Sequence, residues 1–194
     1  CLACLMASAW ASPPTEAPVP GTLRVISDDN FPPYLFRNAD GKQTGYLVDL
    51  WALWSSRTGV AVQLTATNWA EAQVRLLQGD AEVIDMIYRT PSREPLYDFS
   101  APYADLPVSI YSHASISGIH DVSTLRGFQI GVQQGDACID QLQRQGVQSL
   151  KTYRNYAELI GAAMNQEIKL FCLDESPANF YLYQHHAQDA YRKA

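Results

Sequence analysis

Two series of alternating strand-like and helix-like segments run along this chain, and this order restricts its fold more than any other feature of the sequence. In the first series, three apolar, strand-like segments are separated by one segment with apolar side chains at helical spacing and by another that follows a capping-box pattern. The predicted strands span residues 22–27, 60–66 and 81–88, and the predicted helices span residues 47–58 and 69–78. This order predicts a parallel sheet that helices cover on both faces.

One further predicted strand spans residues 107–112, and a second series of the same kind begins at residue 128. Its predicted strands span residues 128–132, 149–153 and 168–173, and its predicted helices span residues 137–145, 155–166 and 176–183. We therefore expect an α/β protein of two lobes. The predicted division is residues 1–20 as a leading segment, residues 21–106 as lobe one and residues 107–194 as lobe two.

Polar side chains stand where several of these predicted strands end. Asp28 and Asp85 end two strands of lobe one, whereas Gln133, Asp136 and Asp174 follow two strands of lobe two. Ligands of open α/β sheets bind outside the carboxyl ends of the strands. The sequence therefore predicts one ligand-binding cleft to which both lobes contribute.

The segment of residues 84–103 gives a second indication of ligand binding. Asp85 lies among apolar neighbours, where a charge is costly unless it is paired or hydrogen-bonded. Pro91 disfavours helical geometry at Thr90, and Arg93 follows Asp85 by eight residues. An acid and an arginine at this spacing suit a zwitterion, and the alternative is a surface loop with a stray charge.

This segment resembles the core motif of the family 3 extracellular solute-binding proteins. The motif consists of an Ile-rich strand, then T-x-x-R, found here at residues 90–93, and FS-x-P-Y, found at residues 99–103. The resemblance covers residues 22 to 183 and implies the two-lobed periplasmic binding protein (Venus flytrap) type II fold. It also implies that Arg93 holds the α-carboxylate of an amino-acid-like ligand. The wording TPxRE…YDFS is closer to family members that serve as sensory domains of signalling proteins.

The resemblance assigns roles to three further residues. Phe31 falls on the aromatic side chain that lies against the ligand's aliphatic part, and Trp69 falls on a second aromatic wall. Core packing is the alternative for both aromatic side chains. Asp174 matches the acid that holds the ligand's α-ammonium, and it could also cap the helix that follows it.

The loop of residues 133–136 departs from the family pattern. Family members usually have Gly followed by Ser or Thr at the start of a helix, whose free N–H groups face the ligand carboxylate. This chain has Asp136 and Ala137 after Gly135. A carboxylate at this position repels a ligand carboxylate unless it turns away as a helix cap.

The turn after Asp85 is the second departure, because Met86 and Tyr88 occupy positions where many members have Ser or Thr. We include both side chains among the candidate contacts. The predicted ligand-binding residues are Asp28, Phe31, Trp69, Asp85, Met86, Tyr88, Arg93, Gln133, Asp136 and Asp174.

The charges of these residues predict a basic ligand. Arg93 supplies one positive group, which is enough for one carboxylate, whereas Asp28, Asp85 and Asp174 supply three acids. Since buried unpaired carboxylates are destabilising, we expect a ligand with extra positive charge, arginine before lysine or ornithine. In the alternative, Asp85 is hydrogen-bonded within lobe one and the ligand is neutral.

Other functional classes find little support in the sequence. The formal net charge of −6 argues against nucleic acid as a partner, and G-x-S-x-G, C-x-x-C and H-E-x-x-H are absent. We predict no catalytic residue, metal or cofactor. The alternative is an enzyme on the same fold, of the cyclohexadienyl dehydratase type, for which Glu175 is the spare acid. A membrane transporter or a fused signalling module is the expected partner.

The termini and cysteines bear on localisation. Residues 1–9 are small and apolar, and residues 9–11 fit the A-x-A cleavage rule, so we interpret the start as a signal peptide remnant of an exported, periplasmic protein. The alternative is an N-terminal tail.

In an oxidising compartment Cys138 and Cys172 are a candidate disulfide, and two buried thiols are the alternative. We also expect the fold to be C-terminally incomplete, because family members return to lobe one after lobe two.

Overall fold

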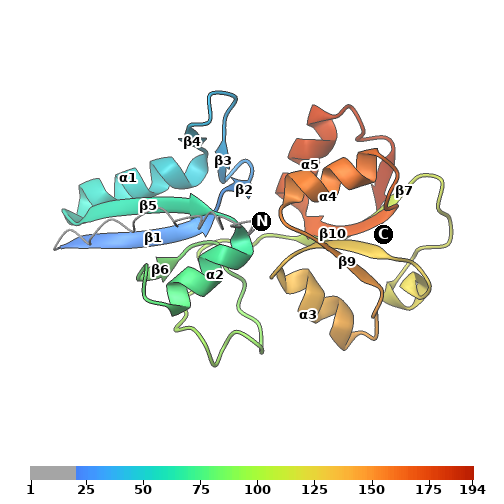
Figure 1. The fold of residues 1–194 in the computed structure, drawn as a ribbon, viewed down its shortest axis with the longest axis horizontal. Helices are drawn as coiled ribbons and strands as arrows, with labels where there is room; N and C mark the ends of the chain where they lie inside the picture. Colours follow the sequence, from blue (N-terminus) through green and yellow to red (C-terminus); the bar gives the residue numbers. More distant parts are fainter. Residues whose placement is uncertain (1–20) are drawn as a thin grey trace, which may run out of the picture.

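The computed structural model describes residues 21–194, and the predicted signal peptide remnant and linker at residues 1–20 lie outside the described residues. Two α/β lobes lie side by side, and the chain passes from one to the other between residues 85 and 107 (Figure 1). One sheet is built from residues 22–84 and the other from residues 108–193. The assignment of residues 21–106 and 107–194 to separate domains stays a prediction.

Lobe one contains a three-stranded parallel sheet in the order β5-β1-β6. Helix α1 lies on one face of this sheet and α2 on the other, as the strand–helix order predicts (Figure 1). A small antiparallel sheet, β2-β3-β4, follows β1. The bounds are β1 Thr22–Asp28, β2 Asn30–Phe31, β3 Leu35–Arg37, β4 Gln43–Thr44, α1 Tyr46–Thr58, β5 Ala61–Thr67, α2 Trp69–Leu77 and β6 Val83–Ile84.

Local chemistry sets the ends of these elements. Gly59 ends α1 in the left-handed conformation, with φ 73°, and its N–H donates to the Ser55 carbonyl. The Asn68 side chain caps α2 by accepting from the N–H of Ala70 at 3.2 Å. The predicted strand of residues 81–88 is wrong in length, since β6 ends at Ile84. Met86 has φ 60°, a left-handed conformation that no strand continues through.

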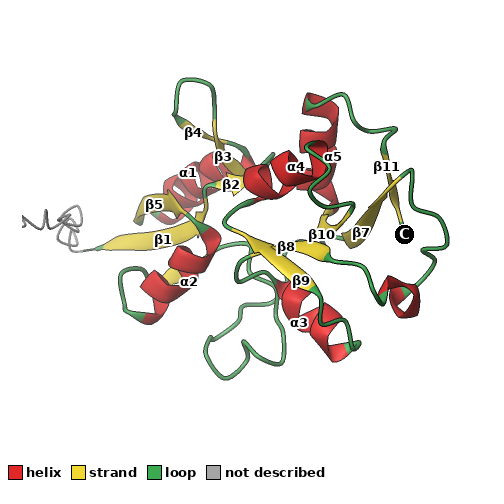
Figure 2. Cartoon of the chain, turned by 45° about the vertical axis from the view of Figure 1, so that its right-hand side comes forward, coloured by secondary structure: helices red, strands yellow, loops and turns green. Residues whose placement is uncertain are grey.

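Lobe two contains a five-stranded sheet in the order β11-β7-β10-β8-β9. Helices α4 and α5 cover one face and α3 covers the other (Figure 2). The bounds are β7 Val108–His113, β8 Ile130–Gln133, α3 Ala137–Arg144, β9 Leu150–Tyr153, α4 Tyr156–Met164, β10 Leu170–Asp174, α5 Glu175–Gln184 and β11 Tyr191–Lys193. A short 3₁₀ helix spans Val122–Leu125.

The sheet of lobe two is mixed. β8 is parallel to β9 and β10, whereas β7 runs antiparallel to both β10 and β11. β7 enters from the interlobe segment rather than from a crossover helix, so nothing forces it to be parallel to its neighbours. β11, which the sequence did not predict, pairs with β7 in lobe two.

The apolar cores of the two lobes differ in size. Lobe two holds two clusters centred on large buried side chains, including Ile130, Leu159 and Phe171. Lobe one holds two small clusters around Ile26 and Leu47. Large apolar side chains on its helices remain about half exposed, among them Leu53 at 52% and Leu77 at 54%.

The predicted disulfide between Cys138 and Cys172 is confirmed. It joins the first turn of α3 to β10 across a Cα–Cα distance of 6.1 Å and lies in a buried cluster of lobe two. The two cysteines lie two residues beyond Asp136 and two residues before Asp174. The bond therefore fixes two elements that carry predicted site residues.

Candidate functional site

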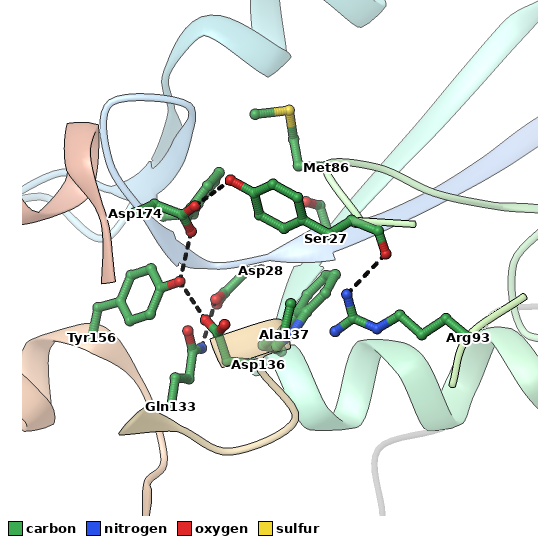
Figure 3. A pocket seen from close by; sticks show the side chains of 12 residues that line it. Ser27, Asp28, Met86, Arg93, Gln133, Asp136, Ala137, Tyr156 and Asp174 are labelled. Carbon is green, nitrogen blue, oxygen red and sulfur yellow. Dashed lines mark hydrogen bonds between the residues drawn. The ribbon is translucent and has the colours of Figure 1, made fainter. Parts of the chain in front are cut away.

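A small cavity lies where the two lobes meet, at the carboxyl ends of β1, β8 and β10 (Figure 3). The side chains around it leave about 20 Å³, which is room for roughly one water molecule. The lobes are therefore closed upon each other. The lining residues are Ser27, Asp28, Phe31, Trp69, Met86, Tyr88, Arg93, Gln133, Asp136, Ala137, Tyr156 and Asp174.

Nine of the ten predicted residues belong to this lining, and Asp85 is the exception. Asp85 is buried within lobe one, where it accepts hydrogen bonds from the indole Nε1 of Trp51 at 2.6 Å and from the N–H of Met86 at 2.8 Å. The Tyr103 hydroxyl donates to the same carboxylate. This is the arrangement of the alternative interpretation, in which lobe one itself satisfies Asp85.

Sequence reasoning missed three lining residues, Ser27, Ala137 and Tyr156. Tyr156 is the most important of them, because its hydroxyl contacts two carboxyl groups of the site. It follows the N-cap Asn155 at the carboxyl end of β9. The rule that side chains at the carboxyl ends of strands line the cleft placed Asp28 and Asp174 there. Applied to β9, the same rule predicts Tyr156.

Asp28 joins the two lobes. Its carboxylate accepts from the N–H of Asn30 at 3.0 Å and from the amide Nε2 of Gln133, on lobe two, at 2.7 Å. Only 4% of Asp28 is exposed, and this burial raises the pKa of its carboxyl group to about 7.

A second group of hydrogen bonds surrounds Tyr156. Its hydroxyl lies 2.7 Å from the Oδ2 atom of Asp136 and 2.8 Å from the Oδ2 atom of Asp174 (Figure 3). Burial raises the pKa of Asp136, and burial together with the neighbouring Asp136 raises the pKa of Asp174 to about 7. The Tyr88 hydroxyl contacts the other oxygen of Asp174 and lies 2.7 Å from the Leu106 carbonyl oxygen.

Of the two acids that could cap a helix, Asp136 does so and Asp174 does not. Asp136 is the N-cap of α3, because its Oδ1 atom accepts from the N–H of Cys138 at 2.7 Å. Asp174 precedes α5 and makes no capping hydrogen bond with its side chain. Its carboxyl group is directed to Tyr88 and Tyr156 instead.

Arg93 connects the two lobes through a hydrogen bond. Its guanidinium donates from Nη1 to the Tyr88 carbonyl at 3.1 Å and from Nη2 to the Gly135 carbonyl of lobe two at 2.8 Å. The guanidinium lies 5.7 Å from the centre of the Trp69 ring, a cation–π contact. Burial lowers the pKa of Arg93.

The Gly135 carbonyl receives three donors from lobe one. Trp69 Nε1 donates at 3.0 Å and Gln73 Nε2 at 3.1 Å, in addition to Arg93. Gly135 has φ 77°, and a Cβ atom on it would stand 2.7 Å from Gln73 Nε2. Only glycine permits this conformation and this approach at low cost.

Phe31 and Asn30, both on β2, contact α4 and α5 of lobe two. Phe31 packs with Tyr156 at a ring-centroid distance of 6.0 Å. The Asn30 side-chain oxygen accepts from the N–H of Ala157 at 2.7 Å and from the Tyr181 hydroxyl at 2.9 Å. Aromatic side chains thus line the cleft as well as the core.

Within residues 21–194, no helix combines the length and apolar character that crossing a membrane requires. Across the same residues, no cluster of three or more His, Cys, Asp or Glu side chains has the arrangement of a metal site.

A cleft between two α/β lobes, lined by acids, an arginine and aromatic side chains, defines a two-lobed small-molecule-binding protein. The chain matches the bacterial extracellular solute-binding proteins, family 3, over residues 23–167. It belongs to this family, and it has the periplasmic binding protein type II fold.

Among characterised relatives, the chain is similar to the L-cystine-binding protein TcyJ of Escherichia coli (strain K12). The two are 31% identical over 140 residues, which cover 69% of this chain and 51% of the relative. The matched region thus spans about half the length of that protein.

Solved structures give the same architecture. An ancestral arginine-binding protein bound to glutamine aligns with a TM-score of 0.78 at 25% identity, covering 91% of this chain and 79% of the other. The arginine-bound form aligns with a TM-score of 0.79 at 24% identity, covering 90% and 78%. A histidine kinase sensor domain similar to periplasmic binding proteins aligns with a TM-score of 0.82 at 20% identity, covering 89% and 75%.

Proposed function

We propose that this protein captures a cationic amino acid between its lobes, with arginine preferred to lysine and ornithine. The observation that carries the proposal is the charge of the closed cleft. Three carboxyl groups, those of Asp28, Asp136 and Asp174, surround a cavity in which Arg93 is the one cationic side chain among the described residues. The three acids counted from the sequence included Asp85. In the structure Asp136 lines the cavity and Asp85 does not.

Electrostatics favours a ligand that brings positive charge to this cavity. Enclosed carboxylates without cationic partners are costly, and the raised pKa of Asp28 expresses this cost. An α-ammonium and a side-chain cation would give two of the three acids a partner. Arg93 would receive the α-carboxylate, for which its planar fork suits a bidentate contact.

The hydrogen bonds of the cleft suggest how the ligand is held. Gln133 of lobe two donates to Asp28 of lobe one, and within lobe two the Tyr156 hydroxyl contacts Asp174, so protein groups occupy these carboxyl groups in the closed cleft. A bound cation would replace these contacts, and between Asp28 and Asp174 it would bridge the two lobes. The ligand would then stabilise the closed state in proportion to its differential affinity for it.

The similar proteins support an amino acid ligand but differ in which one they bind. Their names mention L-cystine, arginine and glutamine. The excess of acids in the present cleft is the reason for placing arginine first. Delivery to a membrane transporter or signalling as a sensory domain are both compatible with the family, and we propose export to the periplasm, where the Cys138–Cys172 disulfide is stable.

The contacts of Glu175 weigh against the enzymatic alternative. Glu175 is not among the lining residues, and its carboxylate is engaged by the Ser109 hydroxyl and the Lys193 ammonium. The ion pair with Lys193 lowers the pKa of Glu175. It is therefore poorly placed to act as an acid or base towards a ligand in the cleft.

Isothermal titration calorimetry tests the proposal. We expect heat of binding with arginine, and weaker binding with lysine and ornithine. Glutamine and L-cystine should bind at least tenfold more weakly than arginine. Asp28→Asn should weaken arginine binding at least tenfold, whereas Asp29→Asn, whose partner is Arg37 at 3.6 Å, should not. Tight glutamine binding without arginine binding would contradict the proposal, as would unchanged arginine affinity in Asp28→Asn.

A further inference from the structure

The hydroxyl of Tyr156 has one hydrogen but two carboxyl neighbours. It lies within 2.8 Å of both Asp136 and Asp174. Oxygen atoms this close need a hydrogen between them, and a hydroxyl can donate only once. If both carboxyl groups were ionised, one of the two contacts would be a repulsion between acceptors. At least one carboxyl group must therefore bring a proton.

The same count applies to Tyr88. Its hydroxyl contacts Asp174 and the Leu106 carbonyl, which can only accept. The two hydroxyl groups supply two hydrogens for four short contacts. Two carboxyl protons complete the set in one direction, since Asp136 donates to Tyr156, Tyr156 to Asp174, Asp174 to Tyr88, and Tyr88 to the Leu106 carbonyl.

The surroundings of this chain of groups favour retention of protons. The titratable groups that interact with its members are Asp28, Tyr34, Arg93 and Tyr111. Arg93 is the one cation among these four, and its guanidinium is already engaged with two backbone carbonyls. Tyr156 is 2% exposed and Asp174 is 5% exposed, so water compensates little for a negative charge there.

We propose that Asp136, Tyr156, Asp174 and Tyr88 form a proton-holding chain that releases a proton when a cationic group of the ligand enters the cleft. The inference rests on the proposed function, because it concerns how that same site accepts a cation. It makes Tyr156 a specificity-determining residue that connects the carboxyl groups of α3 and β10.

The exchange conserves charge within the site. The O–H bond of the Asp136 carboxyl group breaks, its proton passes to the solvent buffer, and the Asp136 carboxylate accepts an N–H hydrogen bond from the ligand's ammonium or guanidinium. One positive charge enters and one leaves. A zwitterion of no net charge brings a carboxylate together with its ammonium, so proton release on its binding would leave the site more negative. The proton-holding chain therefore favours ligands of net positive charge. Burial raises the pKa of Asp136, and it raises the pKa of its neighbour Asp174 to about 7, so both carboxyl groups of this site retain protons more readily than exposed ones.

Calorimetry of arginine binding at about pH 6, in two buffers that differ in ionisation enthalpy, counts the released protons. We expect release of about one proton or more per arginine, and an affinity that rises about tenfold per pH unit for each proton released. Asp136→Asn carries an amide that donates to Tyr156 permanently, so it should release about one proton fewer. Tyr156→Phe should also release fewer protons and flatten the pH profile.

Tyr183→Phe is the matched control, because Tyr183 is 65% exposed and lies outside the cavity lining. It should release as many protons as the unsubstituted protein. Equal proton release by the unsubstituted protein and Asp136→Asn would overturn the inference. Loss of arginine affinity in Tyr156→Phe with an unchanged proton count would also overturn it, since that result describes a purely structural role.

A ligand-free measurement separates this inference from the proposed function. Urea unfolding between about pH 5 and pH 8 should show Asp136→Asn gaining stability relative to the unsubstituted protein as pH rises, because the unsubstituted protein must give up one proton more than the variant. If arginine does not bind but this gain is found, the proposed ligand is wrong and the proton-holding chain stands. A stability difference that does not vary with pH would refute the proton-holding chain, whichever ligand the protein binds.

Discussion

Removal of the Cys138–Cys172 disulfide offers a quantitative test of how lobe two is held together. The bond closes a loop with a sequence separation of 34 residues. The chain-entropy relation for a loop of that length gives about 3.8 kcal/mol of stabilisation at 25 °C. We therefore expect the Cys138→Ala/Cys172→Ala variant to lose about 3–4 kcal/mol of unfolding free energy. For a chain of this size, the loss corresponds to a fall in Tm of about 8–15 °C.

The assay is urea denaturation followed by circular dichroism, with and without a reductant. Because the disulfide acts on the denatured chain, its loss should also increase the m value, as the unfolded state becomes less compact. The reductant should bring the unsubstituted protein to the stability of the variant and should leave the variant unchanged. A loss below about 1 kcal/mol together with an unchanged m value would refute the argument from chain entropy.

Two further substitutions test the cleft. Burial raises the pKa of Asp28 to about 7, so the stabilisation by its proton is complete below its unfolded value of about 4 and is lost as the pH rises through 7. Asp28→Asn should therefore gain stability relative to the unsubstituted protein between pH 5 and pH 8, measured by urea unfolding, and Asp29→Asn should not. Gly135→Ala should destabilise the protein by about 1–3 kcal/mol and loosen lobe closure, seen as a larger radius of gyration in small-angle scattering. Gly146→Ala, with φ 84° but open space around its Cβ position, should cost only about 1 kcal/mol and leave closure unchanged.

The sequence predicted the location of the site better than its internal contacts. Asp28, Gln133 and Asp174 reach one cavity because the carboxyl ends of their strands converge, which strand order alone determines. Asp85 also ends a strand, but Trp51 from α1 and Tyr103 from the interlobe segment hold its carboxylate inside lobe one. Such side-chain contacts between distant segments leave no pattern in a single sequence.

The length of β6 and the direction of β7 could not be predicted from the sequence for a similar reason. The left-handed Met86 ended β6 early, although its neighbours have strand-like composition. The antiparallel direction of β7 depends on its pairing with β10, a partner more than 50 residues away. Periodicity reports which segments form strands, whereas their direction follows from the path of the chain between them.

The unequal cores of the two lobes have a consequence for amide hydrogen exchange. Few fully buried side chains hold β1 and β5 to their helices, whereas β8 and β10 lie between two apolar clusters and a disulfide ties β10 to α3. Local opening should therefore cost less free energy in lobe one, and its amides should exchange with deuterium sooner. Because Asp28 and Trp69 connect that lobe to the cleft, an occupied site should slow exchange in β1 and α2 far more than in β10. Lobe two would then be the rigid lobe, and ligand binding would order lobe one against it.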